Sequence, residues 1–288
     1  KVMFLMVPGI IAGGVTQINM LIDTILASLL PTGSPSWLYV SDRLMQLPLG
    51  IFAIAIATVI LPRLSNLFAS DSREQFSSTL DWSIRLILLI GLPAVIGLVM
   101  LAEPIILTLF ERGEFGAQDS SMASSSLIAL AFGLLAFMLI KILTPSFFAR
   151  QQPKKPMFVA LISMVLNAFL AWLLAFQLGY AHVGLALASS ISAFFTVITL
   201  LILLYKDKVY KSSKGWIYFL FRMLIASLVL ILLINFFSQE VEYLRQISEF
   251  SRFVYIFKIV LIGMVGYFLS LWILGLRIKD FSNTDVFN

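Results

Sequence analysis

The residue best suited to bind an anion is Arg43, which lies within the apolar segment Trp37-Leu-Tyr-Val-Ser-Asp-Arg-Leu-Met-Gln-Leu-Pro48. A guanidinium carries a permanent charge and a planar fork of N–H donors, which match the oxygens of a phosphate. Asp42 precedes Arg43, but adjacent helix positions do not face each other as an i,i+4 pair does. Arg43 therefore either binds an anion inside a helical bundle or forms a structural ion pair with another helix, and both interpretations remain open.

A second group of polar residues could bind a cation. Asn19 and Asp23 are four residues apart, so they share one face of a predicted helix. A carboxylate within a membrane pairs with a base, binds a cation or carries a proton. Asn167 and Ser189, on two other apolar segments, could complete an oxygen cage for Na⁺. Each is equally well explained by a hydrogen bond between helices.

No set of residues typical of an enzyme accompanies these groups. The 288 residues include no cysteine and a single histidine, His182, which excludes thiol chemistry and a multi-histidine metal site. There is no phosphate-binding glycine loop followed by lysine, no acidic metal motif and no Ser/His/Asp set. We expect a protein that is not an enzyme and that needs no cofactor.

The elements that position Arg43 and Asp23 are predicted to be transmembrane helices. The chain is 60% hydrophobic and 12% charged, with a mean hydropathy of +1.00, whereas soluble domains are about half apolar and a quarter charged. Eight apolar runs each reach the roughly 20 residues that cross a bilayer. They lie near residues 4–30, 36–62, 84–110, 122–148, 157–179, 183–205, 216–237 and 253–276. The fold class is therefore an all-α polytopic bundle of about eight helices, with a polar connection at 63–83.

The basic residues predict the orientation of the bundle. Eight spans place both termini on the side that holds Lys1, Arg63, Arg73, Arg150, Lys154, Lys155, Lys206, Lys208, Lys211, Lys214, Arg277 and Lys279. The opposite side holds Arg112, Arg245 and Arg252. Because cytoplasmic loops are enriched in Lys and Arg, we expect both termini in the cytoplasm. The same enrichment explains the net charge of +5 without nucleic acid as a partner.

Several segments together resemble a known family. They are Asn19–Ser28, Leu30–Ser34, Ser41–Gly50, Thr58–Pro62, Lys141–Pro145, Phe148–Gln151 and Gly184–Ala188, in this order. They resemble the second half of the MurJ (MviN) lipid II flippases, which belong to the multidrug/oligosaccharidyl-lipid/polysaccharide (MOP) exporter superfamily. The resemblance covers roughly residues 8–205, and the last two helices match in hydropathy alone. The chain begins directly in an apolar run, without the pattern of a signal peptide, as expected if a first lobe precedes it.

The resemblance implies a fold and an activity. Residues 1–206 would form the second six-helix lobe of the transporter, and residues 207–288 two additional helices with a cytoplasmic tail. The activity would be alternating-access movement of lipid II, an undecaprenyl-pyrophosphate-linked precursor, to the outer leaflet of the bacterial inner membrane. The implied partners are lipid II, membrane lipids and the N-terminal lobe of the same protein.

The resemblance also implies roles for individual residues. Arg43 would bind the pyrophosphate in a cationic central cavity, with Asp42 and Gln46 beside it. Asp23, with Asn19, Asn167 and Ser189, would couple transport to a cation. Ala171, one turn after Asn167, stands where an acidic ligand would strengthen a cation site. The choice between Na⁺, H⁺ and membrane potential therefore stays open.

Three other functions compete with the flippase hypothesis. A related exporter would carry other polyprenyl-pyrophosphate-linked oligosaccharides or drugs, although Arg43 suits a phosphate better than a cationic drug. A polyprenyl-phosphate transferase would need an acidic metal cluster at a membrane face, which the sequence lacks. A membrane scaffold would not need Arg43 or Asp23 within its spans.

Overall fold

The structure, a computed structural model, describes the backbone of residues 2–277 and the side chains of residues 14, 15 and 17–277. Within these residues every regular element is helical. The helices are α1 (Val2–Ser28), α2 (Ser34–Pro48), η1 (Leu49–Ile54), α3 (Ala55–Ala69), α4 (Arg73–Met100), α5 (Ala102–Phe110), α6 (Ala117–Ala149), α7 (Lys154–Trp172), η2 (Leu173–Gln177), α8 (Ala181–Lys206), α9 (Trp216–Phe237), α10 (Val241–Gln246) and α11 (Glu249–Ile273). Lys1 and the predicted tail beyond Arg277 lie outside the described residues.

The predicted class of an all-α membrane bundle is confirmed. Seven helices of the described residues are long and apolar enough to span a bilayer, and α1, of 27 residues, occupies the first predicted run. Two details of the prediction are wrong. The run 84–110 breaks at Leu101 into α4 and α5, and the expected connection at 63–83 is mostly helix, because α3 ends at Ala69 and α4 begins at Arg73.

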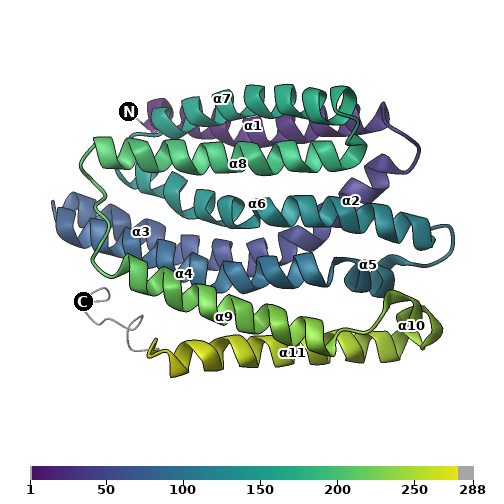
Figure 1. Cartoon of the computed structure of the whole chain (residues 1–288). Coiled ribbons are helices and arrows are strands. Elements are labelled where there is room, and N and C mark those ends of the chain that lie inside the picture. Colours follow the sequence, from purple (N-terminus) through teal and green to yellow (C-terminus); the bar gives the residue numbers. More distant parts are fainter. Residues whose placement is uncertain (1, 278–288) are drawn as a thin grey trace.

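The helices lie roughly side by side in stacked layers (Figure 1). Helices α1, α7 and α8 form one side of the bundle, α6 lies in the middle, and α9 and α11 form the opposite side. In the most apolar 18-residue stretch of α6, 61% of the residues are buried, against 22% in the corresponding stretch of the continuous helix Ser34–Ala69. The largest core cluster accordingly joins α6 to α3, α4 and α8 through residues such as Leu64, Ile87, Leu134 and Leu200.

A π-helical segment interrupts the helix that carries Arg43. Helices α2, η1 and α3 form one continuous 36-residue helix, Ser34–Ala69. Pro48 lacks an N–H, and a proline ring clashes with the carbonyl four residues earlier, so the regular ladder of hydrogen bonds is interrupted there. The π-helix η1, Leu49–Ile54, follows Pro48 directly. Such segments often accompany functional sites, because they leave backbone groups less regularly paired.

Buried charge at one end of the bundle joins α9 to α4. The Asp81 carboxylate is 2% exposed and accepts hydrogen bonds from Tyr210 Oη at 2.7 Å, Trp216 Nε1 at 2.8 Å, Arg85 Nε at 3.0 Å and the Ser213 hydroxyl. Burial and the neighbouring Asp81 carboxylate raise the pKa of Tyr210 well above its usual range. Arg85 and Asp81 thus form an i,i+4 ion pair on α4.

Further ion pairs fix the connections at both ends. Asp207, after α8, accepts from Arg150 at 2.8 Å and from Lys155 at 2.6 Å. Burial opposes ionisation of Asp207, but these two hydrogen-bonded cations outweigh it and lower its pKa. At the other end, Arg245 of α10 pairs with Glu103 of α5 at 3.4 Å and with Glu111 at 3.3 Å. These two pairs hold α10 against the end of α5.

Candidate functional site

The structure brings together the four residues predicted to bind a cation. Asn19 and Asp23 lie on α1, Asn167 on α7 and Ser189 on α8; we call these four residues the Asp23 cluster. The Asn167 amide donates to Asn19 Oδ1 at 3.1 Å and to Asp23 Oδ1 at 3.2 Å. The Ser189 hydroxyl lies 3.3 Å from Asp23 Oδ2 and 3.4 Å from Asn167 Oδ1, and its single hydrogen is shared between these two acceptors.

The chemistry of the Asp23 cluster suits a small hard cation or a proton. Its oxygens come from one carboxylate, two amides and one hydroxyl, and hard cations prefer oxygen ligands. The amide bonds of 3.1 and 3.2 Å lie at the long end of the usual range, and the hydroxyl contacts of 3.3 and 3.4 Å lie beyond it, so these contacts hold the cluster loosely. Ala171 is fully buried one turn from Asn167 and adds no ligand, which leaves one carboxylate and favours a monovalent ion.

Arg43 lies on an uncovered face of the broken helix. Its guanidinium carbon is 4.8 Å from the centre of the Tyr39 ring, one turn earlier. Tyr39, Leu47 and Ile51 are 55%, 58% and 63% exposed. Together with Arg43 they are spaced four residues apart, so all four lie on one side of the helix. Within the described residues no carboxylate lies within ion-pair distance of Arg43, so the structural ion pair considered from the sequence is not formed there.

Asp42 pairs with Gln46 rather than with Arg43. The Gln46 amide donates to the half-buried Asp42 carboxylate one turn earlier, as i,i+4 neighbours on a helix can. Asp42 and Asp23 are close enough for their charges to repel each other. The two groups of predicted residues are therefore neighbours across α1 and α2, and a change in charge in one alters the electrostatic potential at the other.

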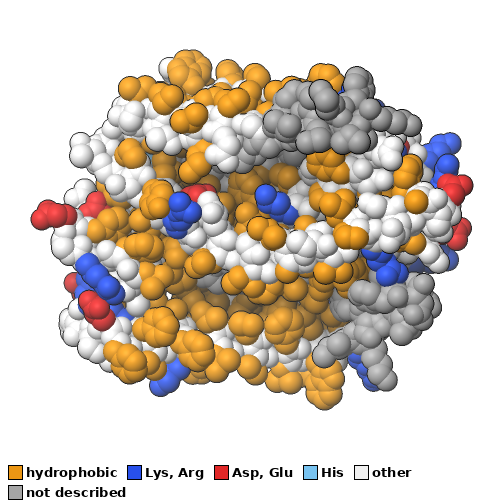
Figure 2. All heavy atoms as spheres, turned by 180° about the vertical axis from the view of Figure 1, so that it is seen from behind, with side chains coloured by type: hydrophobic (Ala, Val, Ile, Leu, Met, Phe, Trp, Pro, Cys, Tyr) orange, Lys and Arg blue, Asp and Glu red, His pale blue; other side chains and the backbone are white. Residues whose placement is uncertain are grey.

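The molecular surface combines a lipid-like exterior with isolated basic groups. Figure 2 shows a face dominated by hydrophobic side chains, with a few Lys or Arg side chains inside the apolar area and a hollow across its middle. Lys141, on α6, is one exposed basic residue within a span. Among the described residues no group of His, Cys, Asp and Glu could hold a metal ion.

Sequence reasoning missed Tyr39 and Asp81. Tyr39 has a simple signal, because an aromatic residue four positions before an arginine on a helix can lie under its guanidinium. Asp81 was assigned to a loop, which concealed its i,i+4 relation to Arg85. Its other partners, Tyr210, Ser213 and Trp216, lie about 130 residues away in the sequence and carry no local signal.

Comparisons with known proteins agree on one family. The profile of the family described as "Lipid II flippase MurJ" matches residues 1–271. The probable lipid II flippase MurJ of Vibrio cholerae is 41% identical over 286 residues, which cover 97% of this chain and 53% of the relative. Its counterpart in Haemophilus influenzae is 41% identical over 96% of this chain and 55% of the relative. The chain thus spans about half the length of the curated relatives it matches.

Solved structures agree with the sequence comparison. A lipid II flippase MurJ in an inward closed conformation matches with a TM-score of 0.72 and 29% identity, over 89% of this chain and 50% of that one. An outward-facing multidrug transporter of the MATE family, within the MOP superfamily, matches with a TM-score of 0.63 and 15% identity, over 98% of this chain and 66% of that one. The second likeness is one of fold alone.

Proposed function

The chain belongs to the lipid II flippase MurJ family, and we propose that it forms the part of a flippase that binds the pyrophosphate of lipid II and couples its movement to an ion. The observation that carries the proposal is Arg43, an exposed guanidinium within a transmembrane helix and without a carboxylate partner in the described residues. A charge at that depth is costly unless a ligand or water compensates it. A pyrophosphate supplies the compensating charge.

The proposed mechanism lowers the cost of moving a polar head group through hydrocarbon. Charged and sugar groups without partners cannot cross the apolar core unaided. In our proposal Arg43 binds the pyrophosphate in a cationic cavity, Asp42 and Gln46 fix the polar surroundings, and the lipid tail stays in the bilayer. Two lobes then rock about the bound head group, in bacterial inner membrane with both termini cytoplasmic.

Ion coupling is assigned to the Asp23 cluster. Binding of a cation or proton neutralises Asp23, which removes its repulsion with Asp42 and so changes the potential beside Arg43. This sequence of events links the ion to the substrate through α1 and α2 without direct contact between them. Na⁺, H⁺ and membrane potential remain the candidate driving forces.

Substitution of Arg43 tests the proposal. In the full-length protein, Arg43→Ala should abolish flipping of labelled lipid II in proteoliposomes, because it removes the only charge assigned to the head group. Arg43→Lys keeps the charge but loses the planar fork, so affinity should fall about ten- to a hundred-fold, the value of a charged hydrogen bond. Arg73→Gln, which removes an exposed charge near the start of α4, is the matched control.

The outcomes separate the flippase from its competitors. Normal growth of cells whose only flippase carries Arg43→Ala would disprove the site assignment. Transport of a cationic drug with greater efficiency than lipid II, and no loss in Arg43→Ala, would favour the drug-exporter alternative. A flippase for another polyprenyl-pyrophosphate-linked oligosaccharide would keep the dependence on Arg43 but prefer the other glycan.

A further inference from the structure

Helix α8 carries a row of hydroxyl side chains beside α7. Ser189, Ser192, Thr196 and Thr199 follow one another at spacings of three, four and three residues, which places them on one face of the helix. Helices α7 and α8 lie side by side (Figure 1). The row begins in the Asp23 cluster, at Ser189, and runs toward the lysine-rich connection after α8, which is predicted to be cytoplasmic.

The first contacts of the row beyond the Asp23 cluster involve Ser163, one turn before Asn167 on α7. The Ser163 hydroxyl donates to the Ser192 carbonyl at 2.9 Å. The Thr196 hydroxyl lies 2.8 Å from Ser163 Oγ and 2.9 Å from the Ser192 carbonyl, so it also binds this pair. Three hydroxyls and one carbonyl oxygen therefore gather next to the Asp23 cluster. We call Ser163, Ser192 and Thr196 the hydroxyl site.

The Ser192 hydroxyl is left unsatisfied by the protein. Ser192 is 4% exposed, and its Oγ has no hydrogen-bond partner among the described residues. A serine or threonine within a helix can donate to the carbonyl four residues earlier, as Thr196 does. Buried hydroxyls nearly always have a partner, and a buried one without it is costly. The open hydroxyl thus indicates a group that binds here from outside the protein.

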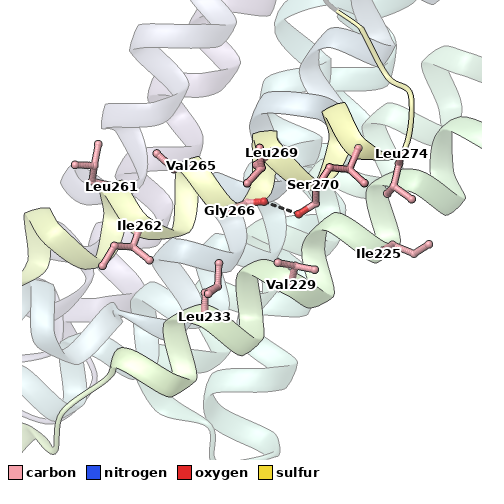
Figure 3. Close-up of a pocket in the computed structure, with 11 residues that line it drawn as sticks. Ile225, Val229, Leu233, Leu261, Ile262, Val265, Gly266, Leu269, Ser270 and Leu274 are labelled. Carbon is pink, nitrogen blue, oxygen red and sulfur yellow. Dashed lines mark hydrogen bonds between the residues drawn. The ribbon is translucent and has the colours of Figure 1, made fainter.

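The groove between α9 and α11 shows the opposite pattern (Figure 3). Ser270 is the one residue with a polar side chain among those that line the groove, and its hydroxyl donates to the Gly266 carbonyl one turn earlier. That hydroxyl is satisfied within its own helix, as lipid surroundings require. Ser192 is more deeply buried and yet has no such bond, so helix packing alone does not explain it.

We propose that the hydroxyl site binds a monovalent cation that passes between the Asp23 cluster and the cytoplasmic side. This inference rests on the proposed function, in which the Asp23 cluster binds the coupling ion. Hydroxyl and carbonyl oxygens are ligands of hard cations. The hydroxyl site contains no carboxylate, so a cation binds it more weakly than the Asp23 cluster and can move on. It also contains no base on which a proton could rest, which favours a metal cation over a proton.

The length of the row fits a path through one leaflet. From Ser189 to Thr199 the helix rises about 15 Å at 1.5 Å per residue, which is half of a hydrocarbon core about 30 Å thick. Thr199 lies seven residues before α8 ends at Lys206. A cation that leaves the Asp23 cluster along this face therefore meets oxygen ligands for most of the way to the head groups.

Silver ion tests the path, because Ag⁺ is a small monovalent cation that binds thiols. Ser192→Cys and Thr196→Cys are made in the full-length protein after any native cysteines have been replaced. Ag⁺ is added to the cytoplasmic side of inside-out vesicles, and the thiols that remain free are counted with a maleimide after denaturation. Both variants should react with Ag⁺, and excess Na⁺ should slow the reaction. The matched control is Ser190→Cys, since Ser190 is 3% exposed but donates to the Ala129 carbonyl of α6.

Alanine variants give a second readout. Ser192→Ala removes no hydrogen bond of its side chain, so its thermal midpoint should equal that of the wild type. It should nevertheless slow flipping driven by a Na⁺ gradient about ten-fold, the effect of one lost ligand. Ser190→Ala should show the reverse, a lower midpoint with the Na⁺ dependence unchanged.

The outcomes distinguish this site from the proposed coupling at Asp23. Ag⁺ reactivity of Ser192→Cys and Thr196→Cys no greater than that of Ser190→Cys would overturn the path, even if flipping follows a Na⁺ gradient. A lower thermal midpoint of Ser192→Ala with unchanged Na⁺ dependence would also overturn it, by making Ser192 structural. Reactive thiols together with unchanged coupling in Asp23→Asn would support the path and refute the role of Asp23 alone.

Discussion

At the scale of single residues, the half-buried Asp23 differs from the buried Asp81 in the weakness of its partners. Asp81 accepts hydrogen bonds of 2.7–3.0 Å from a phenol, an indole and a guanidinium. Asp23 receives only neutral donors, an amide at 3.2 Å and a hydroxyl at 3.3 Å. A neutral donor compensates a charge less well than a cation does, so Asp23 has more to gain than Asp81 from an added cation or proton.

Asp23→Asn should therefore weaken ion coupling while leaving substrate affinity largely intact. The amide keeps the size and part of the hydrogen bonding but removes the charge that a coupling ion would neutralise. The measurement is the dependence of lipid II flipping on a Na⁺ gradient, a pH gradient and the membrane potential, in turn, in proteoliposomes. Ser227→Ala, which changes a buried hydroxyl on α9 away from the cluster, is the control. Unchanged dependence on all three gradients would reduce Asp23 to an interhelical hydrogen-bond acceptor.

The sequence was sufficient to predict which polar residues would meet at the Asp23 cluster. Asn167 and Ser189 are polar residues within apolar runs, and hydrocarbon penalises such groups unless they find each other. The same reasoning fails for Tyr210 and Ser213, which lie in a polar connection where water is an equally good partner. Their bonds to Asp81 depend on tertiary packing that hydropathy does not encode.

At the scale of elements, the Asp81 contacts connect α9 to α4. They join α4 to the connection before α9, which otherwise consists of exposed residues such as Lys211 and Lys214. Hydropathy located these helices, and the predicted run 216–237 has the same bounds as α9. It misplaced the ends of α4 and α5. The break at Leu101 and the start of α4 at Arg73 both fall where apolar and polar residues mix. Hydropathy averaged along the sequence therefore cannot locate them.

Asp81→Ala should destabilise this attachment strongly. It leaves the partly buried Arg85 guanidinium without its carboxylate, which typically costs about 3–5 kcal/mol. The measurement is the free energy of unfolding, or the thermal midpoint, of the purified protein. Asp71→Ala removes an ion pair whose side chains are 81% and 84% exposed, so it should cost about 0–1 kcal/mol. Similar losses in the two variants would show that the Asp81 contacts contribute no more than a surface pair.

At the scale of the whole molecule, alternating helix directions place the connections in two groups. The turns after α3, α6 and α8 lie at one end of the bundle, and those after α1, α5, η2 and α9 at the other (Figure 1). The first group holds the lysine-rich connections and is predicted to be cytoplasmic. This arrangement follows from the sequence alone, because each apolar run reverses the direction of the chain.

Single cysteines can test the orientation, since this chain contains none. Glu114→Cys, in the exposed turn before α6, should react with a membrane-impermeant maleimide applied to intact spheroplasts. Lys208→Cys, in the exposed connection after α8, should react only after the membrane is opened. The reverse pattern would invert the predicted topology.

The uncovered face around Arg43 leads to a prediction about the chain as a whole. Tyr39, Leu47 and Ile51 are more than half exposed beside Arg43, so the described helices form one wall of the proposed cavity. A polar head group bound to a single wall would still face hydrocarbon on its other side, at a prohibitive cost. This 288-residue chain alone, in liposomes, should therefore not flip labelled lipid II, whereas the full-length protein should. Flipping by the chain alone, abolished by Arg43→Ala, would mean that two copies can enclose the path or that one wall suffices.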